Sequence, residues 1–202
     1  MDIGRCFNDA IAVYKKNWLI LFLAAFLYEV LSLVSLLILC GPLTGGVALM
    51  TLRAMRREDK WADMGDLFRP FGSLSQFFRL LGLFFLTVIP ILLGLVLCVL
   101  PGLGLGTIWL FCFYLVVDKK FGVFASLGAS ASIVTRKGIG MNFLLVVLSL
   151  VLELAPSAIP YIGILFAWFI TPIAWLIVTS AYIQEVDEDQ GALSDVFPPA
   201  SS

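Results

Sequence analysis

LLGLFFLTVIPILLGLVLCVLPGLGLGTIWLFCFYLVV, at residues 80–117, is a run of 38 residues without a charged side chain. A bilayer core about 30 Å thick is crossed by about 20 helical residues, whereas one straight helix through this run would be roughly 57 Å long. Glycine and proline interrupt helices, and the PGLG sequence at residues 101–104 lies near the middle of the run. The stretch therefore predicts two helices that fold back on each other as a membrane hairpin.

Two further apolar blocks, at residues 18–52 and 138–184, have the same design. Each contains a single acidic residue and is again too long for one crossing. Breakers lie inside both blocks, GPLTGG at residues 41–46 and PSAIP at residues 156–160. We therefore expect an all-α integral membrane protein, a six-helix bundle of three hairpins. The return helices of the first two hairpins are short, so they cross only by extending into the basic flanks, or else they are re-entrant.

The basic residues give a separate argument for hairpins. All 13 lysines and arginines lie outside the three apolar blocks, and none lies at a hairpin tip. In a hairpin layout they all reach one side of the membrane, as the positive-inside rule expects of the cytoplasmic side. Three single crossings would instead place basic loops on both sides in turn. The sequence therefore predicts one membrane domain at residues 1–184 with both termini in the cytoplasm.

Amphipathic segments precede the hairpins, at residues 2–17, 60–79 and 119–137. In the middle segment, large apolar side chains recur at helical spacing: Trp61, Met64, Leu67, Phe68, Phe71, Leu74, Phe77 and Phe78. We expect interfacial elbow helices that link the hairpins, with basic groups toward the headgroups, or else ordinary helices packed under the bundle. The DIGRCF sequence at residues 2–7 resembles DMGDLF at residues 63–68, which indicates a repeat with an offset of 61 residues.

Composition argues against most catalytic chemistry. Hydrophobic residues make up 61% of the chain, there is no histidine, and the four cysteines lack the spacing of metal ligands. The commonest general base, the Ser-His triads and most zinc sites are thereby removed. The formal net charge of −1 gives no basic field for nucleic acid. We expect no enzyme, no cofactor, no metal and no nucleic-acid partner, and a disordered acidic tail at residues 185–202.

Two carboxyl groups lie inside the apolar blocks. Glu29 follows Trp18 by 11 residues, roughly 16 Å along a helix, and Glu153 lies at a similar depth in the third block. A carboxylate near the bilayer midplane is costly unless it is protonated, hydrogen-bonded or facing water. Glu29 and Glu153 are therefore candidates for an intramembrane ion or proton site. The alternative is a neutral carboxyl with a structural hydrogen bond to a neighbour such as Tyr28, Ser149 or a backbone carbonyl exposed at Pro90.

A basic run follows the first block. Arg53, Arg56, Arg57 and Lys60 are candidate contacts for anionic lipid headgroups, at roughly 1 kcal/mol per charge. The alternative is that these residues only set the orientation of the chain in the membrane.

Several short motifs resemble those of a family of bacterial membrane proteins. The residues that carry the likeness are Gly41-Pro42-Leu43 with Gly46, Leu52-Arg53, Arg57-Glu58, Asp66-Leu67-Phe68 with Phe71, Leu100-Pro101-Gly102, Val117-Asp118, Ala125-Ser126-Leu127 with Ser130, Gly138, Phe143, Pro172 and Ala181-Tyr182. The likeness, over residues 7–184, is to the YciC-type proteins and the membrane domain of some glycerophosphoryl diester phosphodiesterases. It implies a six-helix protein of the bacterial cytoplasmic (inner) membrane and supplies no reaction, because catalysis in the fused enzymes belongs to a separate soluble domain.

These observations lead to two expectations for function. The first is a non-enzymatic membrane protein that contacts lipids or organises a partner, which is another membrane protein or a second copy of the chain. The second is a small proton- or cation-coupled carrier or channel that uses Glu29 and Glu153.

Overall fold

The computed structural model describes residues 2–35, 38–57, 61–158 and 163–187, and within these ranges the chain forms helices and no strand. The long helices are α1 (Ile3–Val34), α2 (Cys40–Arg56), α4 (Leu74–Leu97), α7 (Val123–Lys137), α8 (Ile139–Leu154) and α9 (Gly163–Tyr182). Shorter elements are α3 (Gly65–Phe68), η1 (Arg69–Gly72), α5 (Val99–Ile108), α6 (Cys112–Asp118), η2 (Ala155–Ala158) and η3 (Ile183–Asp187). The prediction of an all-α fold is confirmed.

Four stretches are long and apolar enough to cross a membrane: Ile3–Val34, Leu74–Leu97, Val99–Asp118 and Leu165–Asp187. A fifth is possible if Val123–Arg136 and Ile139–Leu154, which meet at 110°, count as one broken crossing. Large apolar side chains are exposed along these helices, with Val96 85% exposed and Leu97 82% exposed. Exposed apolar surface of this kind needs lipid to cover it. The chain has the helices of a membrane protein, while the six-crossing arrangement stays a prediction.

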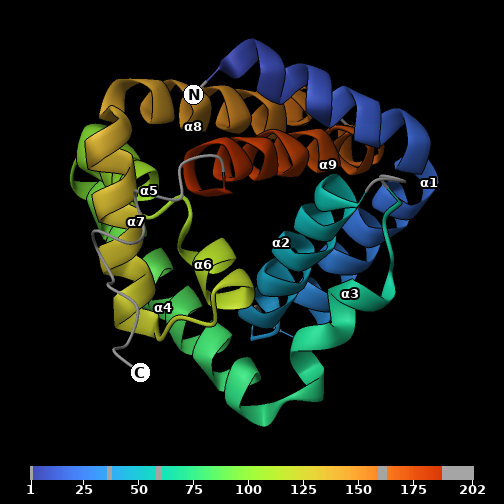
Figure 1. Cartoon of the computed structure of the whole chain (residues 1–202), viewed down its shortest axis with the longest axis horizontal. Coiled ribbons are helices and arrows are strands. Elements are labelled where there is room, and N and C mark those ends of the chain that lie inside the picture. The colour runs from blue at the N-terminus through green and yellow to red at the C-terminus, as the bar shows by residue number, and fades with distance from the viewer. Residues whose placement is uncertain (1, 36–37, 58–60, 159–162, 188–202) are drawn as a thin grey trace.

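Helix α9 packs against both α1 and α8, and Figure 1 shows the three helices side by side. Helix α2 lies near the centre of the molecule, where it contacts α1, α4, α6 and α9. Most of α2 is buried. Its glycines, which have no side chain, allow neighbouring backbone segments to pack closely against it. A Cβ atom on Gly41 would lie 2.6 Å from the Leu80 carbonyl oxygen, and a Cβ atom on Gly46 would lie 2.0 Å from the Leu67 carbonyl oxygen.

The turns of the first two hairpins lie before the glycine-proline clusters that were expected to form them. Residues 41–46 are inside α2, and residues 101–104 are inside α5. Instead, α1 ends at Val34 and α2 begins at Cys40, while α4 and α5 are separated at Cys98, whose backbone is extended (φ −169°, ψ 136°). The physical reason is that a proline in the first turn of a helix lacks only an N–H that would have no partner there. In the third block, Pro156 lies in η2, while residues 159–162 lie outside the described residues.

The amphipathic segments take three different forms. Residues 2–17 continue directly into the first crossing as α1, with a kink at Asn17 (φ −119°, ψ 17°). The described residues 61–79 do not form one amphipathic helix, because Pro70 lies at the start of the short 3-10 helix η1 and the residues from Leu74 onward belong to α4. The third segment forms α7, which is followed by a sharp corner at Gly138, where the positive φ of 110° favours glycine.

Candidate functional site

Glu29, on α1, is joined to Trp168, on α9. The indole Nε1 of Trp168 donates a hydrogen bond of 2.7 Å to Oε2 of Glu29. Phe22 and Phe26, at neighbouring turns of α1, place their rings at 5.9 Å and 4.9 Å from the indole and hold it edge to face. The α1–α9 interface therefore gives the Glu29 carboxyl group a fixed donor. Tyr28 and Ser149 were two of the structural partners suggested from the sequence for the intramembrane acids, and neither is bonded to Glu29 among the described residues.

A groove of about 510 Å³ opens beside this pair on the flank of the helices. It is bounded by side chains of α1, α2, α4 and α9: Tyr28, Glu29, Val30, Ser32, Leu33, Cys40, Phe84 and Trp168. Its surface is mainly apolar, and its volume falls within the range of about 300–1,000 Å³ that is usual for small-molecule sites. Ser32 is 6% exposed, and its hydroxyl group makes no hydrogen bond within the described residues. A buried hydroxyl group without a partner is unfavourable. The Ser32 hydroxyl group is therefore a position in the groove at which a ligand could form a hydrogen bond.

Glu153 lies elsewhere, exposed on α8. The structure shows no hydrogen bond or ion pair between Glu153 and Glu29 in the residues that it describes. Glu153 does lie within electrostatic range of the phenol of Tyr28, next to Glu29 in the chain. The two acids predicted as a candidate intramembrane ion or proton site are therefore not brought into direct contact.

A row of hydroxyl groups continues from the groove into the bundle. Tyr28 shares a hydrogen bond of 3.1 Å with Thr44, and both border an inner cavity of about 110 Å³. Tyr114 also borders this cavity and shares a hydrogen bond of 3.0 Å with Thr179, which donates to Thr51 at 2.8 Å. The cavity is large enough for water, which needs about 10–15 Å³ per molecule by this kind of measure.

Arg56, at the end of α2, joins three parts of the chain. Its guanidinium group donates hydrogen bonds of 2.8 Å to Asp118, at the end of α6, and to Asp187, at the end of η3. The phenol of Tyr182 also donates to Asp118, at 2.9 Å. The bonds to Asp118 raise the pKa of Arg56 above its ordinary value, so this side chain stays charged. We call Arg56, Asp118, Tyr182 and Asp187 the Arg56 cluster.

The four basic residues proposed as candidate anionic-lipid contacts have different environments. Arg53 is ion-paired with Asp66, and Arg56 belongs to the Arg56 cluster, so both charges are already matched inside the protein. Arg57 is exposed, with one hydrogen bond of 3.3 Å to the backbone oxygen of Trp61. Lys60 lies outside the described residues. Lipid contact by this run stays a prediction, and the internal ion pairs argue against Arg53 and Arg56 as its main donors.

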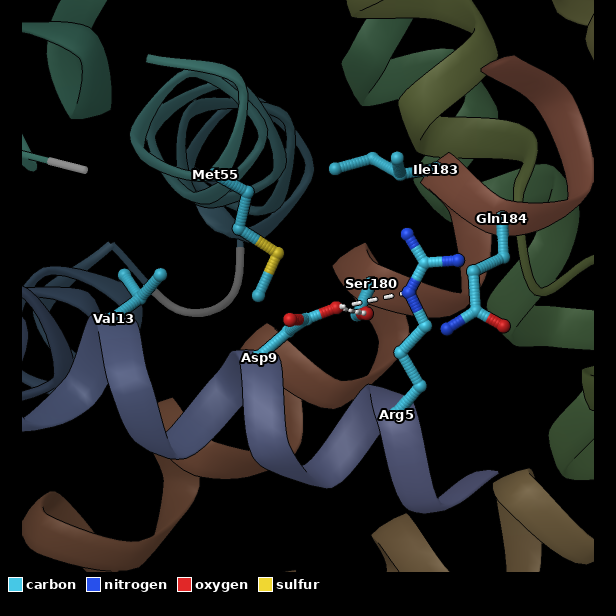
Figure 2. Close-up of a pocket in the computed structure, with 7 residues that line it drawn as sticks. All are labelled: Arg5, Asp9, Val13, Met55, Ser180, Ile183 and Gln184. Atoms are coloured by element: carbon cyan, nitrogen blue, oxygen red, sulfur yellow. Dashed lines mark hydrogen bonds and ion pairs between the residues drawn. The ribbon is translucent and has the colours of Figure 1, made fainter. Parts of the chain in front are cut away.

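A second polar cavity, of about 200 Å³, lies where α1, α2 and α9 meet. Figure 2 shows Arg5 and Asp9 of α1 pointing toward Ser180 of α9, with Met55 of α2 and Gln184 on the other sides. Asp9 lies 3.9 Å from the Arg5 guanidinium group and accepts a hydrogen bond of 3.3 Å from Ser180. The positive charge of Arg5 and the negative charge of Asp9 therefore balance each other in this cavity.

A third cavity, of about 270 Å³, has basic side chains and no acidic one among the residues that border it. It lies between the start of α4 and the end of α6, and we call it the Arg79 pocket: Ser73, Ser75, Gln76, Arg79, Val116, Val117 and Lys120. Arg79 donates a hydrogen bond of 3.2 Å to the backbone oxygen of Lys120. In the sequence, Arg79 and Lys120 served only as evidence for the orientation of the chain in the membrane. Because 41 positions separate them, the sequence did not indicate that they would meet. Their positions at the two ends of the uncharged run were the only available signal.

Comparisons with protein-family models, with curated proteins and with solved structures give no match for this chain.

Proposed function

We propose that this chain is a non-enzymatic integral membrane protein that holds lipid. The groove beside Glu29 is the observation that carries the proposal. Val30, Leu33 and Phe84 give it an apolar wall, and it is open on the flank of helices that are long enough to cross a membrane. A hydrocarbon chain is the ligand that such a wall at this depth would favour. Glu29 and Ser32 add polar positions at which a lipid hydroxyl or ester group could bond.

The lipid proposal is tested by filling the groove. Val30 borders the groove, so the substitution Val30→Trp is expected to occupy part of its volume and to reduce the lipid that the protein retains through purification. Native mass spectrometry of the detergent-purified protein measures this retention directly. Val96→Trp is the matched control, because Val96 is exposed on α4 and does not border the groove.

Wild-type protein with no retained lipid, or equal retention in both tryptophan variants, would contradict a lipid-holding groove. A retained protein in place of lipid would instead favour the partner-organising form of the same non-enzymatic role.

The hydroxyl row supports a second candidate, a small proton- or cation-coupled carrier or channel. Glu29 borders the groove, and Tyr28 borders both the groove and the inner cavity. Beyond this cavity the bonded hydroxyl groups of Tyr114, Thr179 and Thr51 extend the polar row. Hydroxyl groups and cavity water form the type of relay that moves protons inside membrane proteins.

The carrier candidate predicts that Glu29→Gln abolishes proton flux in proteoliposomes, because the amide cannot release a proton. A pH-sensitive dye inside the vesicles measures the flux after a pH step. Asp63→Asn is the control, since Asp63 is an exposed carboxyl outside the row. Glu153→Gln reports whether the second acid participates. Equal flux through wild-type protein and Glu29→Gln would eliminate the carrier candidate.

The finer localisation is also a proposal. We place the chain in the bacterial cytoplasmic (inner) membrane, with three hairpins, six crossings and both termini in the cytoplasm. The positions of the 13 basic residues outside the apolar blocks support this orientation. The likeness to YciC-type proteins supports the choice of membrane.

A further inference from the structure

We propose that the Arg79 pocket binds the phosphate group of an anionic membrane lipid, an inference that rests on the proposed lipid-holding function and specifies a second, headgroup-binding site. Arg79 and Lys120 both border this cavity of about 270 Å³. Arg79 immediately precedes the uncharged run at residues 80–117, and Lys120 follows it closely. A cation at the end of an apolar helix lies at headgroup depth, where lipid phosphate groups are found.

The charge of the pocket is unmatched within the described residues. Neither Arg79 nor Lys120 has an ion pair there, and the pocket has no carboxylate. The nearest acid along the chain, Asp118, is occupied by Arg56, Tyr182 and Lys119. The two cations therefore contrast with Arg53 and Arg56, whose charges are matched inside the protein. Unmatched positive charge that is gathered in a concave site attracts an anion.

The other polar groups of the pocket add hydrogen-bond donors for the oxygen atoms of a phosphate group. Ser73, Ser75 and Gln76 add side-chain donors along one wall of the pocket. Ser73 is the N-cap residue of the 24-residue helix α4, and its hydroxyl group makes no capping hydrogen bond. The first-turn N–H groups of α4 thus add partial positive charge on the same side. Arg79 is oriented by its bond to the backbone oxygen of Lys120, which ties the two cations together.

The test uses the full-length protein in detergent and three short-chain lipids, which are dioctanoyl phosphatidic acid, dioctanoyl phosphatidylglycerol and dioctanoyl phosphatidylcholine. Inorganic phosphate is the soluble competitor. Native mass spectrometry titrations measure the Kd of each lipid. We expect the two anionic lipids to bind more tightly than the zwitterionic lipid, and phosphate to compete only weakly. Phosphate that binds as tightly as the anionic lipids would overturn the assignment to a membrane lipid.

Two variants remove the charges one at a time. Arg79→Gln and Lys120→Asn are each expected to raise the Kd of the anionic lipids about fivefold. Asparagine is chosen at position 120 because Lys120 has a left-handed backbone (φ 57°), which asparagine tolerates. Lys15→Gln is the matched control, because it removes one exposed charge far from the pocket in the sequence and does not border it. Arg79→Lys keeps the charge and should retain most of the affinity.

An equal loss of affinity in Lys15→Gln and in the pocket variants would show diffuse attraction to the surface and would overturn the site. Unchanged affinity in Arg79→Gln and Lys120→Asn, with thermal stability preserved, would overturn it as well. Loss of thermal stability in Arg79→Gln together with unchanged affinity in Lys120→Asn would assign Arg79 a structural role and also reject the site. The groove is tested separately by Val30→Trp, so failure of the Arg79 pocket and failure of the lipid-holding function give different results.

Discussion

Replacement of Arg56 by glutamine is expected to lower the apparent Tm of the purified protein by about 4–8 °C, which corresponds to about 2 kcal/mol. Arg56 is the shared partner of Asp118 and Asp187, and it ties α2 to the ends of α6 and η3. The side chain of Asp118 is only 12% exposed, so without Arg56 its charge would be left in a poorly hydrated position, with the phenol of Tyr182 and the Lys119 ammonium group, at 3.5 Å, as its described partners. Because the Arg56 side chain is 35% exposed, solvent reduces the full penalty of a broken buried pair.

The matched control for Arg56 is its neighbour. Arg57→Gln also removes one charge, but Arg57 is exposed, and the bond it makes to the described residues is a long hydrogen bond of 3.3 Å to the backbone oxygen of Trp61. Its effect should stay within about 0.5 kcal/mol, as is usual for surface substitutions. Asp118→Asn in the Arg56→Gln background should cost less than in wild-type protein, because the two residues share one interaction. Equal melting temperatures for the Arg56 and Arg57 variants would contradict a stabilising Arg56 cluster.

Gly46→Ala should destabilise the protein at least as strongly, by about 3 kcal/mol or more. The added Cβ atom would lie 2.0 Å from the carbonyl oxygen and 2.8 Å from the carbonyl carbon of Leu67. Both are backbone atoms of α3, so the clash cannot be relieved by a side-chain rotation. Helices α2 and α3 would have to separate, which would expose part of the buried surface of α2. Thermal unfolding in detergent, followed by circular dichroism, measures the loss.

Gly82→Ala is the control for Gly46→Ala. Gly82 is inside α4, and a Cβ atom added there would have no neighbouring atom within 4 Å outside its own helix backbone. Alanine should therefore be neutral at this position or stabilise the helix by up to about 1 kcal/mol. Similar stability of the two alanine variants would show that α2 and α3 can adjust, and the close-packing explanation of Gly46 would then be wrong.

The positions of the turns depend on both local sequence signals and the packing of distant helices. Glycine and proline at residues 41–46 and 101–104 correctly indicated that the apolar blocks are interrupted, but the interruptions occur just before them. A sequence pattern shows that a residue suits a turn, yet the same residue also suits the first turn of a helix or a close helix contact. The contacts of Gly41 and Gly46 with α4 and α3 decided between these roles.

The residues of the candidate sites could also be predicted from the sequence only in part. Glu29 was identifiable from its depth in an apolar block, whereas its partner, Trp168, is 139 residues away. Asp118 and Asp187 are 62 and 131 residues from Arg56, and nothing local to the basic run indicated that its charges would be matched internally. The Arg79 pocket likewise depends on two residues that only the packing of α4 against the end of α6 brings together.

By itself, the sequence determined that the chain is helical, that its apolar segments have membrane length, and where the acidic residues inside those segments lie. These properties depend on the free energy of transferring consecutive residues into lipid, which is a local sum over the chain. Only the tertiary structure decided which charges are matched, which glycines are contacts and where cavities remain. These depend on the approach of distant helices, because a difference of one or two ångströms between helix axes decides whether an ion pair forms or a pocket stays open.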